Sequence, residues 1–191
     1  MNAAMKQFVQ SGYERASTNE IVKDANISKG SLFNYFHNKK DLYFYLIEHA
    51  IKVIDGIYDE IDWSERDLFK RIGQVGLIKL KIQQKYPLVF DFLQSIVQEQ
   101  AGEVKQDIEH IRSSILNNGL NKIYENIDMS KFREEVDPQK ALHILNWTMV
   151  GFAELQIKKI GSFENVGMEL IHEWNSYSEM LKRCFYKEEG K

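Results

Sequence analysis

The feature that most constrains the fold is a pair of short helices joined by a tight turn, within residues 17–43. Ser17 is followed by Glu20 in a capping-box spacing, in which the hydroxyl accepts a helical N–H and the carboxylate reaches back to the N–H of Ser17. Asn26 tolerates the left-handed conformation that a helix end requires. Because Ser28 then provides a second N-cap, the sequence predicts a helix-turn-helix.

The second of these helices has one apolar side. Leu32 and Phe36 are spaced i, i+4 and are expected to point inward together, with Ile27 filling the corner of the turn. The side chains between them point mostly outward; they are Ser31, Phe33, Asn34 and Tyr35. The outward face as a whole carries Lys, Ser, Asn, Tyr and His. Such a face suits the major groove of DNA.

Two further helices flank this pair. Ala4 and Phe8 share one face of a preceding helix, which Gly12 can end because glycine adopts the left-handed conformation freely. Lys39 to about Asp59 forms one long helix that leaves the helix-turn-helix and is a candidate lever between domains.

The same segment resembles the signature of the TetR family of transcriptional regulators over about the first 45 residues. The matching positions occur in register and are Gly12, Tyr13, Ala16, Ser17, Ile21, Ala25, the run from Ile27 to Phe36, and the run from Lys39 to Leu42. The resemblance implies a homodimeric regulator, usually a repressor, whose C-terminal domain senses a ligand.

Three positions depart from the family pattern. The family usually has Thr at Ala16 and Tyr at Phe33, so two hydroxyls that could contact phosphate are missing. It usually has Gly at Asn26, where Asn can take the same backbone conformation. We also expect the first helix to be shortened at its start. These departures leave a second hypothesis open, a helical interaction or sensor protein of the same fold that has lost DNA binding.

Composition agrees with a helical protein. The chain has 191 residues, of which 43% are hydrophobic, so it is long enough to bury a sizeable core. It has only two prolines and no run of alternating β-branched residues, which predicts an all-α fold. The expected organisation is a three-helix DNA-binding domain at residues 1–46 and a larger helical domain at residues 47–191 for ligand binding and dimerisation.

The charge is distributed unevenly. The net charge is −3, yet the first 45 residues contain six basic and four acidic side chains. The resulting +2 places the phosphate-facing surface at the N-terminus. No apolar run approaches about 20 residues and no signal-peptide pattern is present, so we expect no membrane association. A single cysteine, Cys184, fits a reducing cytoplasm.

The candidate DNA-binding residues gather around the second helix and the start of the long helix. Each has an ordinary alternative: the lysines can be solvated, Asn34 can be an exposed polar residue instead of a base reader, Tyr35 can pack on the first helix, and His37 can cap a helix end. The set consists of Ser17, Ser28, Lys29, Gly30, Ser31, Phe33, Asn34, Tyr35, His37, Lys39 and Lys40.

The last two helices are candidates for a dimer interface. The final helix, at about residues 164–186, has a coiled-coil-like stripe. The stripe consists of Ile171, Trp174, Ser178, Leu181 and Phe185. The helix before it, from Pro138 to about Ile160, has a similar stripe with Gly151 in its middle. The family resemblance favours a homodimer through these helices; the alternative is that both stripes are ordinary core.

An effector site is the other expected feature. The aromatic content favours a mainly apolar or aromatic ligand of unknown identity. The candidates, each of which can equally be core, are Trp63, Phe90, Gln94, Asn146, Trp147 and Phe152. The five histidines lack metal-ligand spacing, and no nucleophile or phosphate-loop motif occurs, so we expect no metal, no cofactor and no catalysis. The expected partners are a double-stranded DNA operator, the small effector and a second copy of the chain.

Overall fold

The computed structural model describes residues 1–188, excluding the side chains of residues 114–121. The described chain is helical apart from turns and one isolated bridge between Phe132 and Tyr186. It divides into two compact units, one formed by Met1–Asp59 with Lys85–Gly119 and the other by Glu60–Gln84 with Leu120–Lys191. The predicted domain boundary after residue 46 lies inside the first of these units, and it stays a prediction.

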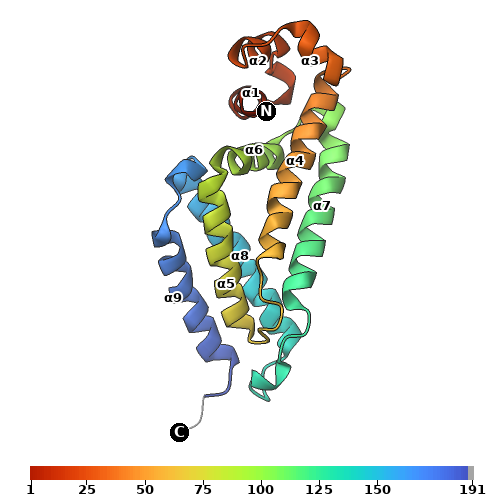
Figure 1. Ribbon diagram of the computed structural model, residues 1–191. Coiled ribbons are helices and arrows are strands. Elements are labelled where there is room, and N and C mark those ends of the chain that lie inside the picture. Colours follow the sequence, from red (N-terminus) through yellow and green to blue (C-terminus); the bar gives the residue numbers. More distant parts are fainter. Residues whose placement is uncertain (189–191) are drawn as a thin grey trace. The chain divides into compact units, whose positions relative to one another are not determined.

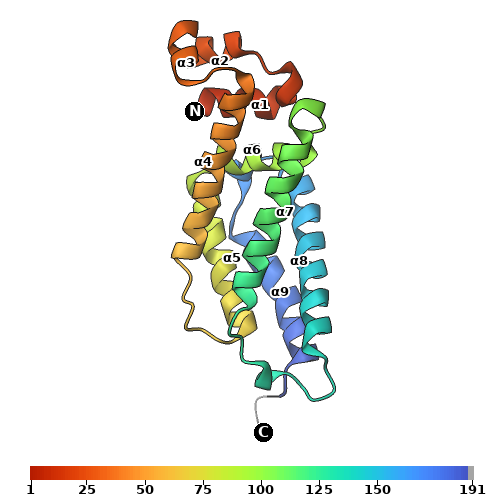
Figure 2. The same cartoon turned by 90° about the vertical axis from the view of Figure 1, so that its right-hand side faces the viewer.

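The first unit contains the helix-turn-helix and the helices that support it (Figure 1). Its elements are α1 (Asn2–Arg15), α2 (Thr18–Asp24), α3 (Lys29–Tyr35), α4 (Lys39–Asp59), α6 (Pro87–Gln98) and the first part of α7 (Gly102–Tyr124). Helix α1 packs against α2 and α6, and Figures 1 and 2 show α4 and α7 side by side. The predicted long helix from Lys39 to Asp59 is confirmed.

Helix α1 bends sharply at Gly12, which has φ +69° and ψ 171° inside the helix. Only glycine adopts such a conformation readily, which is why the sequence needs it here. The bend frees the N–H of Tyr13, which donates to the carboxylate of Glu99 at 2.7 Å. A distant side chain thus holds the end of α1 in place.

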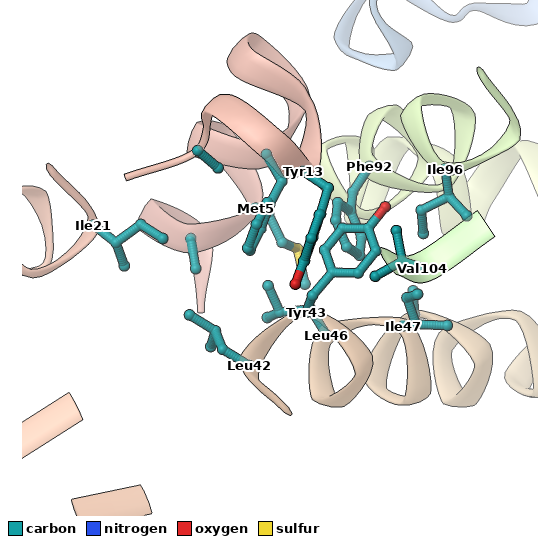
Figure 3. Close-up of a cluster of buried hydrophobic side chains, with 14 of the residues drawn as sticks. Met5, Tyr13, Ile21, Leu42, Tyr43, Leu46, Ile47, Phe92, Ile96 and Val104 are labelled. Atoms are coloured by element: carbon teal, nitrogen blue, oxygen red, sulfur yellow. The ribbon is translucent and has the colours of Figure 1, made fainter. Parts of the chain in front are cut away.

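One apolar cluster connects these helices (Figure 3). Aromatic rings from α1, α4 and α6 meet at its centre, with Phe8 and Tyr13 4.8 and 5.0 Å from the ring of Tyr43. Phe92 adds a ring 5.6 Å from the ring of Tyr43. Leu32 of α3 is buried in the same cluster. Because the rings pack edge to face, a favourable arrangement for aromatic pairs, the cluster fixes the helix-turn-helix to α4 and α6.

The second unit is formed by α5 (Leu68–Lys85), the end of α7, α8 (Pro138–Ile160), α9 (Met168–Phe185) and two 3-10 turns, Met129–Lys131 and Phe163–Asn165. Asp137 caps α8 by accepting from the N–H of Gln139 at 2.9 Å, and Gly161 ends the helix with φ +69°. The predicted bounds of this helix are confirmed.

A buried polar network organises one end of this unit. The guanidinium of Arg71 is almost fully buried and donates to the carbonyls of Trp63, Glu65, Ile123 and Glu125. Asp67 pairs with Lys131 at 2.6 Å and accepts from the N–H groups of Phe69 and Lys70. Asp67 therefore starts α5. Ser64, three residues earlier, also has the side chain of a good N-cap, which from the sequence alone predicts a helix start there; that prediction is wrong, since Ser64 lies in a turn where its hydroxyl donates to Asp62.

The stripe on α9 was expected to form a dimer interface, and that prediction is wrong. All five of its residues are buried within the chain. Trp174, Leu181 and Phe185 join a core cluster with Leu145 of α8, while Ile171 packs with Leu80 of α5. The spacing of apolar residues reflects packing inside the unit.

Candidate nucleic-acid interface

The turn between α2 and α3 closes as the sequence predicts. Asn26 has φ +53°, the N–H of Ile27 donates to the carbonyl of Val22 at 3.0 Å, and the N–H of Asn26 donates to that of Lys23 at 3.1 Å. These two bonds form a Schellman motif. Ile27, expected to fill the corner, is 44% exposed instead.

Serine hydroxyls set the starts of both helices. Ser17 accepts from the N–H of Glu20 at 3.5 Å, and Ser28 accepts from the N–H of Ser31 at 3.0 Å. The hydroxyls of Ser28 and Ser31 also lie 2.9 Å apart. Ser17 and Ser28 thus act first as caps, and Ser31 remains exposed beside them.

The outward face of α3 is confirmed. Phe33, Asn34 and Tyr35 are exposed, as are Lys29 and Gly30. Tyr35 is 84% exposed, which excludes the alternative that it packs on α1. The ammonium of Lys29 lies 5.9 Å from the centre of the Phe33 ring. This face offers hydrogen-bond donors, hydrogen-bond acceptors and a cation to any groove that is wide enough to admit the helix.

The two lysines at the start of α4 have different surroundings. Lys39 donates to the carbonyls of Tyr13, Glu14 and Ala16 at 2.7, 2.9 and 3.3 Å. Since an ammonium has three donors, this lysine caps the end of α1 and has none to spare for phosphate. Its ammonium also lies 4.6 Å from the centre of the Tyr13 ring.

Lys40 points to α7. Its ammonium lies 3.0 Å from the carboxylate of Asp107 and donates to the carbonyl of Glu103 at 3.0 Å. Sequence reasoning missed both partners, because nothing local to Lys40 signals residues more than 60 positions away.

The polar groups between α3 and α4 fix the start of α4. Asn38 accepts from the N–H of Asp41 at 2.8 Å, and Asp41 accepts from the N–H of His37 at 3.1 Å. The side chain of His37 is exposed. Ala16 is buried, so a hydroxyl at this position would not face solvent. Its replacement of the usual Thr therefore argues little against DNA binding.

The candidate effector residues have varied surroundings. Phe90 and Gln94 belong to the first unit, and the other four to the second. Trp147 is 72% exposed, and the Trp63 ring centre lies 5.8 Å from the Arg71 guanidinium. Asn146 accepts a hydrogen bond from the hydroxyl of Tyr124. Burial raises the pKa of Tyr124 to about 12.

Phe152 packs against the aromatic rings of α9. Its ring centre lies 5.5 Å from that of Trp174 and 5.8 Å from that of Tyr177. Tyr124 and Phe152 thus both pack on the apolar core of the second unit, and Tyr124 also forms the polar pair with Asn146. Within the described residues, no group of three or more His, Cys, Asp or Glu side chains is arranged to hold a metal ion.

Comparison with known proteins assigns this helix-turn-helix. Residues 1–46 match the family described as bacterial regulatory proteins, tetR family. The uncharacterized HTH-type transcriptional regulator YhgD of Bacillus subtilis (strain 168) is 22% identical over 145 residues, which cover 76% of this chain and 75% of that protein.

Two solved structures share the fold over nearly the whole chain. A TetR family transcriptional regulator from Chloroflexus aurantiacus J-10-FL has a TM-score of 0.63 at 20% identity, covering 97% of this chain and 91% of that one. The fatty acid degradation regulator FadR from Bacillus halodurans has a TM-score of 0.64 at 19% identity, covering 94% and 90%.

The fold and its exposed helix thus resemble those of helix-turn-helix transcriptional regulators. Residues 1–46 match the tetR family of bacterial regulatory proteins, and the chain as a whole shares the fold of solved TetR family regulators. Among the described helices, none combines the length and apolarity that crossing a lipid bilayer requires.

Proposed function

We propose that the chain is a cytoplasmic homodimeric repressor that leaves a palindromic DNA operator when a small ligand binds. The observation that supports DNA binding most directly is the exposed face of α3, on which Lys29, Ser31 and Asn34 surround the buried anchor Leu32. In this proposal Asn34 contacts a base edge, and Lys29, Ser31 and Tyr35 contact phosphates. Lys39 supports the site by capping α1.

Binding to the DNA upstream of the chain's own gene tests this proposal. We expect a gel shift at low salt that weakens steeply as salt rises, because a module of net charge +2 depends on phosphate contacts. A doubly substituted Lys29→Ala, Asn34→Ala variant should fold normally and lose the shift. A wild-type chain that binds neither this DNA nor any selected from a random pool would instead favour the interaction protein without DNA binding.

Repression is tested in cells with a reporter gene. The operator placed ahead of a reporter gene should give low expression in the presence of the chain. A rise in expression on adding the chain would assign activation instead. A cytoplasmic location predicts that the chain fractionates with soluble proteins after lysis.

The dimer that we propose uses the exposed faces of α8 and α9, which differ from the stripe expected from the sequence. Ile144, Trp147 and Leu155 are 41%, 72% and 61% exposed along one side of α8. Gly151 lies between them, and a Cβ placed there would meet nothing within 4 Å in its own chain. On α9, Tyr177 and Met180 are similarly exposed. Apolar side chains around an open glycine suit close packing against a second copy, since monomers rarely expose large contiguous apolar patches.

Trp147→Glu tests this interface. Because Trp147 is mostly exposed, we expect the variant to keep its helical circular dichroism, to become monomeric by light scattering and to lose operator affinity. Leu77→Glu is the matched control, since Leu77 is 48% exposed on α5, a helix that is not part of the proposed interface. A dimeric Trp147→Glu variant would contradict the proposed face.

The effector that we propose is mainly apolar or aromatic, with Asn146 orienting it and Phe152 packing against it. The pair formed by Tyr124 and Asn146 places polar atoms among side chains that pack on the core of the second unit. A ligand that binds only the folded chain raises its melting temperature. Apolar aromatic compounds that do so should lose this effect in Asn146→Ala, and an undiminished effect would place the site elsewhere.

A further inference from the structure

Lys40 is one of the candidate DNA-binding residues of the sequence, yet in the structure its side chain is held by α7. We propose that the ion pair between Lys40 and Asp107 is an autoinhibitory contact, which withholds one cationic contact from DNA until it opens. This inference rests on the proposed DNA binding and concerns its regulation.

The ammonium of Lys40 is well occupied in the structure. Besides Asp107 at 3.0 Å and the carbonyl of Glu103 at 3.0 Å, it lies 5.6 Å from the centre of the Phe44 ring. A carboxylate, a helix carbonyl and a ring face each attract an ammonium. These contacts occupy two of the three donors of Lys40 and place a carboxylate beside its charge, which weakens its attraction to a phosphate.

The position of Asp107 is fixed by the residues around it. Val104 and Ile108, on either side of it along α7, are buried in the core of the first unit. One carboxylate oxygen of Glu99 accepts from the N–H of Ala101 at the start of α7, and the other from the N–H of Tyr13. The first turns of α7 are thereby tied to α1, so Asp107 stays beside the start of α4.

The pair can nevertheless open. The side chains of Lys40 and Asp107 are 36% and 52% exposed, and ion pairs of this exposure are weak. An open cavity of about 370 Å³ adjoins them, lined by Lys40, Phe44, Asp107, His110 and Ile111, which gives the lysine side chain room to move. Lys39 differs because three carbonyls hold it.

Removing the charge of Asp107 should therefore strengthen DNA binding. We expect Asp107→Asn to raise operator affinity by about 1.5-fold to 5-fold per protomer, the range that a weak ion pair represents. The released lysine should also make the dependence of log affinity on log salt steeper by about one unit per protomer.

The experiment measures affinity by fluorescence anisotropy, using a duplex that the wild-type chain binds, at several salt concentrations. Glu109→Gln is the control, since it removes the same charge from an exposed position on α7. Asp107→Asn is also made in a Lys40→Ala background, where the proposal predicts no gain because the released partner is absent.

The possible results distinguish failure of the autoinhibitory contact from failure of the proposed DNA binding. A gain specific to Asp107→Asn, with a steeper salt slope that disappears in the Lys40→Ala background, supports the contact. An unchanged or weaker affinity overturns it, as does an equal gain in Glu109→Gln or in the Lys40→Ala background. If neither the wild type nor Asp107→Asn binds any duplex, the proposed function itself fails and the inference with it.

Discussion

Gly30 is exposed as the second residue of α3, and the fold gives no reason for a glycine there. A Cβ at this position would lie 3.7 Å from the hydroxyl oxygen of Ser28, an ordinary contact, and Gly30 is not among the glycines with positive φ. A glycine inside a helix costs about 0.5–1 kcal/mol relative to alanine. We infer that the small residue lets the DNA backbone approach closely.

Gly30→Ala should therefore separate stability from binding. We expect the free energy of unfolding to rise by about 0.5–1 kcal/mol, which for a chain of this size raises the melting temperature by roughly 1–4 °C. Operator affinity should fall by about 5-fold to 150-fold, because an added methyl in a close-packed contact typically costs about 1–3 kcal/mol.

Urea unfolding and fluorescence anisotropy on the same preparations measure the two effects. Gly56→Ala is the matched control, since Gly56 lies in α4 with nothing within 4 Å of its Cβ position. The control should gain stability and keep its affinity. A Gly30→Ala variant that is more stable and binds as the wild type does would refute the close approach. A less stable variant would refute the argument from helix propensity.

Three further outcomes follow from the geometry. Asn34→Ala should relax discrimination at one base pair by about 1–3 kcal/mol, and an unchanged consensus in a binding-site selection would contradict base reading. Burial alone would raise the pKa of Asp67, but hydrogen bonds from Lys131 and backbone N–H groups hold it below the usual value. Its contribution to stability is thus present above about pH 4 and lost as pH falls through the lower folded pKa, so wild type and Asp67→Asn should converge in urea unfolding at strongly acidic pH. Leu181→Ala should cost about 2–5 kcal/mol of stability and Leu77→Ala almost none, since of the two only Leu181 is buried.

Helix ends were predictable where the signal is local. Asp137 with Pro138 starts α8 and Gly161 ends it, because a cap, a fixed φ and a left-handed residue act within one turn of the chain. The start of α5 was not predictable in this way. Ser64 and Asp67 are both good N-caps, and the choice of Asp67 accompanies its ion pair with Lys131, 64 positions later.

The candidate DNA-binding site likewise has features that local sequence predicts and features that depend on residues distant in the sequence. The outward face of α3 follows from the spacing of Leu32 and Phe36, since the side chains between them must point elsewhere. The roles of Lys39 and Lys40 do not follow, because adjacent lysines look alike in a sequence. Their difference comes from carbonyls at the end of α1 and a carboxylate on α7, which only the folded chain brings near.

Helix α9 shows why an interface is harder to predict than a core. Its most regular apolar stripe is buried within its own chain. The side of a helix that packs on the core carries the most regular spacing of apolar residues, so a regular stripe indicates core before it indicates an interface. The face left exposed has mixed character, with Tyr177 and Met180 at 41% and 57% exposure. On α8 a 72% exposed tryptophan, Trp147, lies one turn from Gly151. A large exposed aromatic beside an open glycine is unusual for a solvated helix, and the sequence alone cannot say that either faces outward. Exposure in the folded chain, and not periodicity, therefore selects the surface that a second copy would cover.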